Sequence, residues 1–526
     1  MSEELLPRAL PLSELLLAAG LVLQGCGGGG SSSPAPTPPT AEQLKATCLS
    51  LAGQVIEGVT ITKTTRHEAN AAVSSPGFCQ VLGTRAPYLD IEIDVPDHWT
   101  GRYWQQGGGG FDGQIPSAVT TDAGGAITAL SAIVANKGAV YAASNGGNRA
   151  NVPSQAAPGI WASASPEGRQ SATDYAYAAL GTTVYFGKAV TKAFFGKAPS
   201  HSYFNGCSNG GRNAYIAAQR WPQEFDGIVS GCETMDMAGQ TSAWLQEAAA
   251  KGTPAALSAA QINAAHGAAV AACDGLDGVA DEVIANPTAC RFDPAALQCG
   301  AAGASPDPAI CLSAPQVATM KSYFTDLKLQ NGTSLLSGYW WSSGLGQGWE
   351  LLGGGFALLA SGDVAWLTPA RQSAFQLETD YPLLKTGLSQ IGADHDKAAI
   401  AGFVASGRKL ISWHGGSDGL LSPADHYRNW TAMAGVAQSK GLADPGTATR
   451  FFIVPGATHG VGQSLWEVDW ASAIMDWVEK GAAPQQLIYT ATSGTTTRSK
   501  PVCRHPLYPR YNGSGDVNQA SSYTCS

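Results

Sequence analysis

Three short segments of this 526-residue chain carry residues that could together perform nucleophilic chemistry. The stretch 206–210 reads Gly-Cys-Ser-Asn-Gly, and its Gly-x-Ser-x-Gly spacing is typical of a strand-to-helix turn that exposes a reactive serine. Far downstream, Asp418 and His459 each follow a short apolar run that ends in small residues. A serine hydroxyl is a weak nucleophile, so it needs a base to take its proton and a carboxylate to orient that base. The sequence therefore predicts Ser208 as nucleophile, His459 as base and Asp418 as acid.

Each of these assignments has an alternative. Ser208 could lie in an ordinary glycine-rich loop, and His459 could be a structural loop histidine. Asp425 and Asp363 are rivals of Asp418, but Asp418 is favoured because it comes directly after a strand-like run. The order serine, aspartate, histidine along the chain is that of the α/β-hydrolase triad, which favours the catalytic interpretation.

A second glycine-rich segment could supply hydrogen-bond donors to the same reaction. Residues 107–110 are four consecutive glycines that follow the strand-like run 102–106. Such a run is costly in conformational entropy, but it lets backbone N–H groups approach a ligand closely. An oxyanion hole needs a donor of this kind besides the N–H that follows the nucleophile. A flexible loop without a binding role is the alternative.

The elements around these segments indicate an α/β fold with a mostly parallel sheet covered on both faces. Strand-like apolar runs alternate with helical stretches such as 167–194 and 213–220. The run 89–95 alternates strictly between apolar and acidic residues, which predicts a half-exposed strand. We interpret His414, near the end of another run, as a structural residue. The strand-like runs are residues 89–95, 102–106, 138–143, 201–206, 225–232, 409–414 and 450–454.

The alternation of strands and helices is lost between residues 234 and 400. This stretch is rich in alanine and glycine and contains clustered cysteines and tryptophans. At about 165 residues it is too long to be a loop, so we predict one inserted lid domain. The predicted organisation is a leader and linker at 1–40, an α/β-hydrolase catalytic domain at 41–233 and 401–526, and the lid at 234–400.

Composition and the N-terminus predict an exported protein. The formal net charge is −9 and the chain has no basic run, which argues against nucleic acid or an anionic membrane surface as partner. Eleven scattered cysteines without a Cys-x-x-Cys pair are typical of disulfide bonding and do not suggest a zinc ribbon. Leu15–Leu23 has the length of a signal peptide, and Cys26 follows it in the manner of a bacterial lipoprotein cleavage site. Simple signal cleavage without lipidation is the alternative.

The predicted lid carries a constellation of acidic residues that could hold a cation. Asp274, Asp277 and Asp281 are spaced at offsets 0, 3 and 7 among glycines, so their carboxylates could wrap a hard ion such as calcium. The backbone carbonyls of Val279 and Val283 could complete the shell. The spacing differs from that of an EF-hand, and a solvated acidic turn is an equally acceptable interpretation.

In combination these features resemble the tannase and feruloyl esterase family, which also includes mono(2-hydroxyethyl) terephthalate hydrolases. The likeness runs from about Ala41 to the C-terminus. The resemblance implies an α/β-hydrolase core with a large lid over the active site, and it supports the triad named above. It also implies oxyanion donors in the N–H groups of Gly110 and Asn209, and a structural Ca²⁺ in the lid bound by the residues just named. The segments that carry the resemblance are 206–212, 273–281, the loops of Asp418 and His459, and 510–515.

The cysteines show one departure from the family. In the family, the cysteine before the serine usually bonds a cysteine directly after the histidine, but here Gly460 follows His459. The resemblance implies four bonds among eight of the other cysteines, and Cys26 is assigned to a lipid. Cys207 and Cys232 then remain, and we hypothesise that they bond to each other. Two unpaired thiols are the alternative. The bonds that the resemblance implies are Cys48–Cys79, Cys273–Cys290, Cys299–Cys311 and Cys503–Cys525.

The resemblance implies a small-molecule ester of an aromatic acid as substrate, such as a ferulate, gallate or terephthalate. Terephthalate hydrolases of the family use a lid arginine for the free carboxylate, whereas residues 358–366 contain no arginine and Arg371 does not match the motif. We therefore expect a feruloyl or galloyl ester. Terephthalate-monoester hydrolysis, acyl transfer to an alcohol, and an inactive ligand-binding protein stay open. The lid aromatics that could stack on such a ring are Tyr339, Trp340, Trp341, Trp349, Phe356 and Trp366, most of them expected to be lid core.

Overall fold

This computed structural model describes residues 38–149, 161–459, 467–493 and 496–526. The predicted signal segment, the lipidation site Cys26 and nearly all of the linker lie outside these residues, so they stay predictions. Residues 39–526 form a single unit by their internal contacts, and the predicted boundaries of the lid therefore also stay a prediction. Within the described ranges, none of the helices combines the length and apolarity that crossing a bilayer requires.

The fold is built on a ten-stranded sheet in the order β1-β2-β3-β4-β8-β5-β9-β10-β13-β14. The strands from β1 to β8 in this order pair antiparallel, and those from β8 to β14 pair parallel. The strands are β1 (Val55–Ile56), β2 (Val59–His67), β3 (Phe78–Arg85), β4 (Leu89–Pro96), β5 (Arg102–Gln106), β8 (Val140–Ser144), β9 (His201–Cys207), β10 (Gly227–Gly231), β13 (Lys409–Gly415) and β14 (Thr449–Val454).

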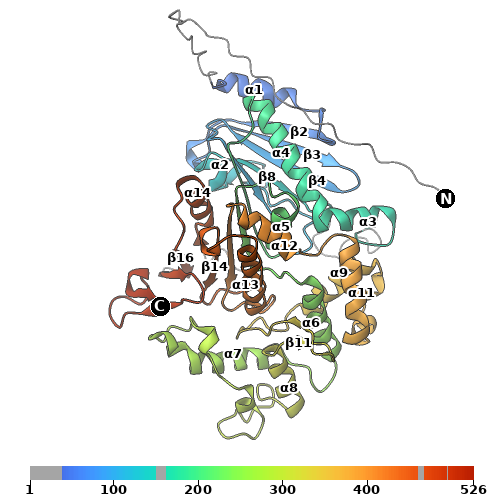
Figure 1. The fold of residues 1–526 in the computed structure, drawn as a ribbon, viewed down its shortest axis with the longest axis vertical. Helices are drawn as coiled ribbons and strands as arrows, with labels where there is room; N and C mark the ends of the chain where they lie inside the picture. Colours follow the sequence, from blue (N-terminus) through green and yellow to red (C-terminus); the bar gives the residue numbers. More distant parts are fainter. Residues whose placement is uncertain (1–37, 150–160, 460–466, 494–495) are drawn as a thin grey trace, which may run out of the picture. The chain divides into compact units, whose positions relative to one another are not determined.

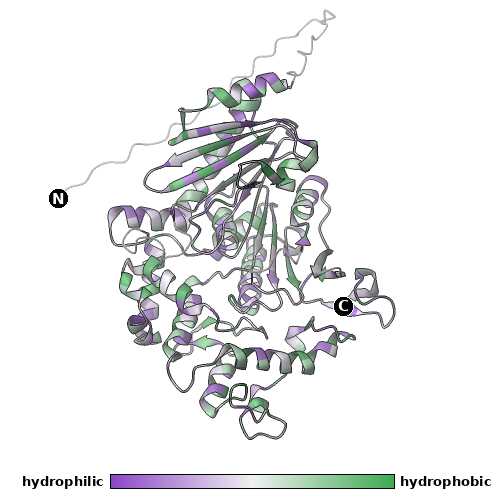
Figure 2. Ribbon diagram, turned by 180° about the vertical axis from the view of Figure 1, so that it is seen from behind, coloured by the Kyte–Doolittle hydropathy of each residue, from purple (hydrophilic) through white to green (hydrophobic). Residues whose placement is uncertain are grey.

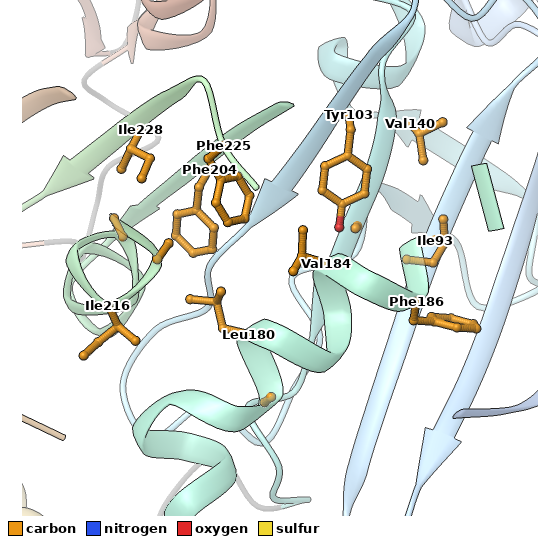
Figure 3. Packing of buried hydrophobic residues seen from close by; sticks show 14 of the residues in the cluster. Ile93, Tyr103, Val140, Leu180, Val184, Phe186, Phe204, Ile216, Phe225 and Ile228 are labelled. Carbon is orange, nitrogen blue, oxygen red and sulfur yellow. The ribbon is translucent and has the colours of Figure 1, made fainter. Parts of the chain in front are cut away.

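Helices cover both faces of this sheet. Neighbouring strand residues point to opposite sides, so each face packs its own set of side chains against helices. Tyr103 and Phe204 pack with Leu180 of α4 in one hydrophobic cluster (Figure 3). Trp104 and Tyr203, the neighbours of those two strand residues, pack in a second cluster with α14. Apolar colouring of the central strands in Figure 2 agrees with a sheet buried on both sides. The helices around the sheet are α1 (Ala41–Ser50), α2 (Ala132–Ala135), α3 (Pro166–Thr173), α4 (Ala179–Phe195), α5 (Asn209–Arg220), α12 (Lys397–Ala405), α13 (Pro423–Ser439) and α14 (Trp470–Lys480).

The α/β fold class predicted from the sequence is therefore confirmed, but the exposure of one strand is not. Strand β4 is buried on both faces, and the prediction that it is half-exposed is wrong. Two of its three acidic residues, Glu92 and Asp94, are 4% and 0% exposed, and Asp90 is partly buried. The Glu92 carboxylate accepts hydrogen bonds from the Ser117 hydroxyl (2.6 Å) and the Ala118 N–H (3.1 Å), so a loop covers the face that the pattern left open. Burial raises the pKa of Asp94 well above its usual value, and the nearby charge of Glu92 adds to this.

The segment 234–400, which we call the lid segment, contributes no strand to the ten-stranded sheet, and all of it is described. It is mostly helical, and Figure 1 shows its helices in green to orange. Its elements are α6 (Met237–Ala250), α7 (Ala259–Cys273), α8 (Ala314–Tyr323), β11 (Leu327–Lys328), β12 (Ser334–Leu336), α9 (Trp349–Ser361), α10 (Pro369–Ser373) and α11 (Leu377–Gln390). The remaining strands form small separate sheets: β6 (Val119–Thr121) and β7 (Ile127–Leu130), β15 (Glu467–Val468) with β16 (Gln486–Ser493) and β17 (Thr496–Cys503), and β18 (Pro509–Tyr511) with β19 (Tyr523–Cys525).

Candidate active site

Ser208 lies at a sharp turn between a strand and a helix, as its flanking glycines predict. Strand β9 ends at Cys207 and α5 begins at Asn209, and Ser208 between them has φ +61°, a conformation that is strained for a residue with a side chain. A Cβ atom on Gly206 would collide with the backbone of Gly210. A Cβ atom on Gly210 would lie 2.7 Å from the carbonyl oxygen of Gly108. Both glycines are therefore needed because backbone packs directly on backbone.

The structure brings the three predicted triad residues together. Ser208, Asp418 and His459 follow β9, β13 and β14, which run parallel and end at the same edge of the sheet. His459 Nδ1 donates to Asp418 Oδ2 at 2.7 Å, which leaves its Nε2 to accept from the Ser208 hydroxyl at 2.9 Å. This is the tautomer that a general base requires.

The Asp418 carboxylate is fully buried and stays ionised. Its Oδ1 accepts from the backbone N–H groups of Leu420 (2.8 Å) and Leu421 (3.0 Å), and its Oδ2 accepts from both His459 and His414. Burial alone would raise the pKa of Asp418. The facing imidazole of His459, together with the hydrogen bonds from His414 and His459, outweighs burial and holds the pKa well below its usual range. His414, which the sequence indicated as a structural strand residue, thus contacts Asp418 directly.

The two rival aspartates have other partners. Asp425 forms an ion pair with Arg428 and accepts from the Ser337 N–H at 2.9 Å. Asp363 caps a short 3₁₀ helix by accepting from the Ala365 N–H at 2.9 Å, and it is exposed. The geometry therefore selects Asp418 as the carboxylate that contacts His459.

The two predicted oxyanion donors lie beside the serine. Gly110 and Asn209 line the same cavity as Ser208 and His459. The Tyr175 hydroxyl donates to the Gly110 carbonyl at 2.7 Å, which holds the glycine loop in place. The Asn209 side chain donates to Asp112 Oδ1 at 2.7 Å and so ties the turn of the nucleophile to that loop.

Asp112, which was not singled out in the sequence, is the buried acid that connects the glycine loop to the turn of the nucleophile. Burial raises the pKa of Asp112 to about 7, although the hydrogen bond from Asn209 and the charge of Arg212 oppose the shift. The pKa of Asp112 is therefore higher in the native state than in the unfolded state, where it is about 4. Its contribution to the free energy of unfolding is fully present below pH about 4 and is lost as the pH rises through about 7.

We expect Asp112→Asn to remove this pH dependence while keeping the acceptor for Asn209. Between pH 4 and 8, the unfolding free energy of the wild type should fall relative to that of the variant by up to about 4 kcal/mol. Urea denaturation at each pH measures both values. Parallel stability profiles for the two proteins would contradict the assignment.

The triad opens into a cavity of about 450 Å³ whose walls are mostly apolar. Of the six lid aromatics considered from the sequence, Phe356 lines this cavity, whereas Trp349 and Trp366 are buried in the core of the lid segment. Trp244, which was not singled out in the sequence, also lines the cavity. The apolar side chains of the lid segment and of the loop after β13 that line it are Met237, Trp244, Leu352, Phe356, Leu420 and Leu421.

The structure contains the hypothesised bond between Cys207 and Cys232, whose Cα atoms are 5.3 Å apart. Cys207 ends β9 and Cys232 follows directly after β10, and these two strands pair in parallel with Gly231 opposite Cys207. The alternative of two unpaired thiols is therefore wrong in this structure. The four bonds that the family resemblance implied are also present, namely Cys48–Cys79, Cys273–Cys290, Cys299–Cys311 and Cys503–Cys525.

Replacing Cys207 and Cys232 together with serine should lower the unfolding free energy by about 2–4 kcal/mol. It should also lower kcat/KM, because the bond fixes the residue next to Ser208. Denaturant unfolding and ester turnover measure the two effects. The matched control, Cys299→Ser with Cys311→Ser, removes a bond within the lid segment and should reduce stability alone. A free Cys207 thiol in non-reducing peptide mapping would refute the bond.

The three aspartates predicted to bind calcium lie near one another, and Lys500 lies against one of them. Asp274 already accepts from the backbone N–H groups of residues 281–283. Asp277 Oδ2 and Asp281 Oδ1 are buried and find no hydrogen-bond partner in the described part of the chain. Burial raises the pKa of Asp277 to about 6. The Lys500 ammonium lies against Asp281 Oδ2 and is buried. In the described ranges, no group of three or more His, Cys, Asp or Glu side chains is arranged to hold a metal ion.

Comparisons with known proteins show a family and a fold for this chain. A family model described as tannase and feruloyl esterase matches residues 72–350 and 388–526. The chain is 30% identical to the mono(2-hydroxyethyl) terephthalate hydrolase of Piscinibacter sakaiensis, over 86% of each chain. It is 29% identical to an uncharacterized esterase of Xanthomonas campestris pv. campestris, over 92% of each. The crystal structure of feruloyl esterase B from Aspergillus oryzae superposes with a TM-score of 0.75 at 22% identity, covering 92% of this chain and 100% of that one, which confirms the fold.

Proposed function

This chain belongs to the tannase and feruloyl esterase family, and we propose that it is a serine carboxylic-ester hydrolase that acts through an acyl-enzyme. The observation that carries the proposal is the hydrogen-bonded series from Asp418 through His459 to Ser208 at an apolar cavity. A serine, a base and an orienting acid in contact are the constellation that acyl transfer requires.

In the proposed reaction, Ser208 Oγ attacks the ester carbonyl carbon while His459 Nε2 takes the hydroxyl proton. The N–H groups of Gly110 and Asn209 stabilise the oxyanion that forms, and losing one such donor typically costs about 10²–10³-fold in kcat. His459 then gives its proton to the leaving alcohol, and the acyl group stays on Ser208. Water, activated by the same imidazole, releases the acid, while Asp418 stabilises the imidazolium in both steps.

We propose that the acyl group is a neutral aromatic acid of the feruloyl or galloyl type. Trp244 and Phe356 offer aromatic surface in the cavity. Arg212 is the cation among its lining residues, but its guanidinium donates to the backbone carbonyls of Ala176 (2.9 Å) and Tyr175 (2.6 Å). A substrate carboxylate would therefore find no available Arg or Lys side chain among the described residues that line the cavity.

Arg371, the other candidate partner for a carboxylate, is engaged in the lid segment. It pairs with Asp380 at 2.7 Å, and its guanidinium carbon lies 3.5 Å from the centre of the Trp366 ring. This arrangement argues against a terephthalate monoester as the preferred substrate, although the Piscinibacter sakaiensis relative is named for that activity.

A panel of feruloyl, galloyl, terephthaloyl and p-nitrophenyl esters with product identification tests the proposal. We expect kcat/KM for the feruloyl or galloyl ester to exceed that for the terephthalate monoester at least tenfold. The reverse order would overturn the substrate assignment and leave the esterase assignment standing. Acylated alcohol in place of free acid among the products would instead identify an acyltransferase.

We also propose that the lid segment binds a structural Ca²⁺. The orphaned oxygens of Asp277 and Asp281 fit a hard cation, and Asp274 with the carbonyls of Val279 and Val283 would supply the other ligands. The ion would neutralise the buried carboxylates and would take no part in the reaction. It would have to displace the ammonium of Lys500, which lowers the affinity expected for it.

Calcium added to chelator-treated protein should therefore raise Tm by a few degrees, because a ligand that binds the native state stabilises it. Lys500→Met should enlarge this rise, since it removes the competing charge, and Asp277→Asn should abolish it. Thermal unfolding and the bound metal content of the purified protein are the measurements. Metal-free protein whose Tm does not respond to calcium would leave the acidic turn paired with Lys500 as the correct interpretation.

Export is a further part of the proposal. Five disulfide bonds are typical of a protein that folds in an oxidising compartment. The proposed lipid anchor at Cys26 would tether the enzyme to a bacterial membrane, and mass spectrometry of the mature N-terminus tests it. Since Cys26 lies outside the described residues, this part depends on the sequence alone.

A further inference from the structure

A second imidazole besides His459 contacts the acid of the triad. His414 Nε2 lies 2.9 Å from Asp418 Oδ2, the same oxygen that accepts from His459 Nδ1 at 2.7 Å. His414 is fully buried and is not among the residues that line the cavity, so it cannot touch a substrate there. Its effect on the reaction must therefore pass through Asp418.

A chain of buried hydrogen bonds continues from His414 into the core. His414 Nδ1 lies 2.9 Å from His426 Nδ1, and His426 Nε2 lies 2.8 Å from the Tyr215 hydroxyl. The Tyr215 hydroxyl in turn lies 2.7 Å from that of Ser412. His426 and Ser412 are 0% exposed, as is Tyr215, so water does not compete for these contacts.

With a neutral His414 ring, the chemistry of the other members sets one direction for each of these bonds. The ionised Asp418 can only accept, so His414 Nε2 carries the proton and, in a neutral ring, Nδ1 accepts. His426 must then donate through Nδ1 and accept through Nε2, which requires the Tyr215 hydroxyl to donate to it. Burial and the nearby imidazole of His414 hold the pKa of His426 well below its usual value, which keeps that ring neutral. Each proton therefore points toward Asp418.

We propose that His414 is a positioning residue for the esterase reaction, and that His426 and Tyr215 hold it in the tautomer that donates to Asp418. This inference rests on the proposed function. The second donor stops the carboxylate from rotating away from His459, and it withdraws part of the negative charge that His459 feels. The titratable and charged groups around His414 and its partner His426 are Asp418, His459, Tyr215, Glu233 (3.8 Å from His426 Nε2), His395 and Asp425.

The proposal predicts a shift in a pH profile as well as a loss of rate. Without the hydrogen bond from His414, Asp418 presents more negative charge to His459 and stabilises its imidazolium more strongly. The acidic limb of kcat/KM should therefore move to higher pH by about 0.5 unit or more, because that limb reports ionisation of the base. A residue with a purely structural role would lower the rate without moving this limb.

The test compares four proteins on one chromogenic aryl ester across pH 5–9. His414→Phe keeps the volume and removes the donor, so kcat should fall about 10–100-fold, with KM nearly unchanged and the limb displaced. His414→Gln can still donate an N–H, so it should recover most of the rate and the wild-type limb. Tyr215→Phe removes one hydroxyl remote from the cavity and releases the tautomer of His426, so it should displace the limb in the same direction by less.

Folding is checked by Tm and circular dichroism, and Tyr215→Phe decides the matter if His414→Phe fails to fold. Limbs that coincide with the wild type in the folded variants would overturn the inference, as would equal rates for His414→Phe and His414→Gln. If the wild type itself shows no turnover that depends on Ser208, the proposed function fails instead, and the two failures are thus distinguished.

Discussion

Replacing Ser208 with alanine is expected to lower kcat by about 10⁴-fold or more with little change in KM or Tm. The hydroxyl is the atom that His459 Nε2 contacts at 2.9 Å, and without it no acyl-enzyme can form. Alanine should fit the turn, because it has the same Cβ atom as serine and lacks only the hydroxyl oxygen. The backbone can therefore keep its φ of +61°. The residual rate would come from the oxyanion donors and substrate binding alone.

Steady-state turnover of a p-nitrophenyl ester measures the loss, and mass spectrometry of a quenched reaction should find an acylated serine peptide in the wild type only. Ser361→Ala is a suitable control, since the Ser361 hydroxyl donates within its own helix to Ala357 at 2.7 Å. It should keep the wild-type rate. Equal slow turnover by the wild type and Ser208→Ala would refute the serine mechanism and leave the inactive ligand-binding protein as the better interpretation.

The triad could be predicted from the sequence because each of its members follows a strand. Parallel strands present their carboxyl ends at one edge, so the residues after β9, β13 and β14 converge although up to 251 positions separate them. The glycines were equally informative, since Gly206 and Gly210 have a local steric reason that any sequence with this turn must satisfy. Local rules thus sufficed to predict that Ser208, His459 and Asp418 lie in contact.

The walls of the site could not be predicted in the same way. Trp244 reaches the cavity because α6 packs against α9, and such a contact depends on how the lid segment folds as a whole. Lys500 lies against Asp281 across more than 200 positions of sequence, and no periodicity indicates this pairing. The exposure of Glu92 was misjudged for the same reason, since the loop that covers it is distant in sequence. Long-range packing, which a pattern of residue types does not encode locally, decides all three.

Replacing Asp418 with asparagine should also lower kcat by about 10⁴-fold, and the reason lies in how its oxygens are used. The carboxylate accepts four hydrogen bonds, two from backbone N–H groups on Oδ1 and two from imidazoles on Oδ2. An amide has one oxygen, so in either orientation its NH₂ group faces two donors. The backbone donors cannot change, whereas an imidazole can shift its proton. The NH₂ group should therefore face the histidines and force both into the other tautomer.

In that tautomer, His459 carries its proton on Nε2, which faces Ser208 and can no longer act as a base.

Asp425→Asn makes the same chemical change seven positions later and is the matched control. Asp425 bonds Arg428 and Asn429, with no contact to His459 among its hydrogen bonds, so this variant should lose stability while keeping most of its kcat. Steady-state kinetics with Tm for both variants decides between them. Substantial turnover by Asp418→Asn, with loss of turnover in Asp425→Asn, would move the acid of the triad to Asp425. Because the pKa of Asp418 is held far below neutrality, acidification to pH 5 should leave its carboxylate ionised and should not reproduce the effect of the asparagine.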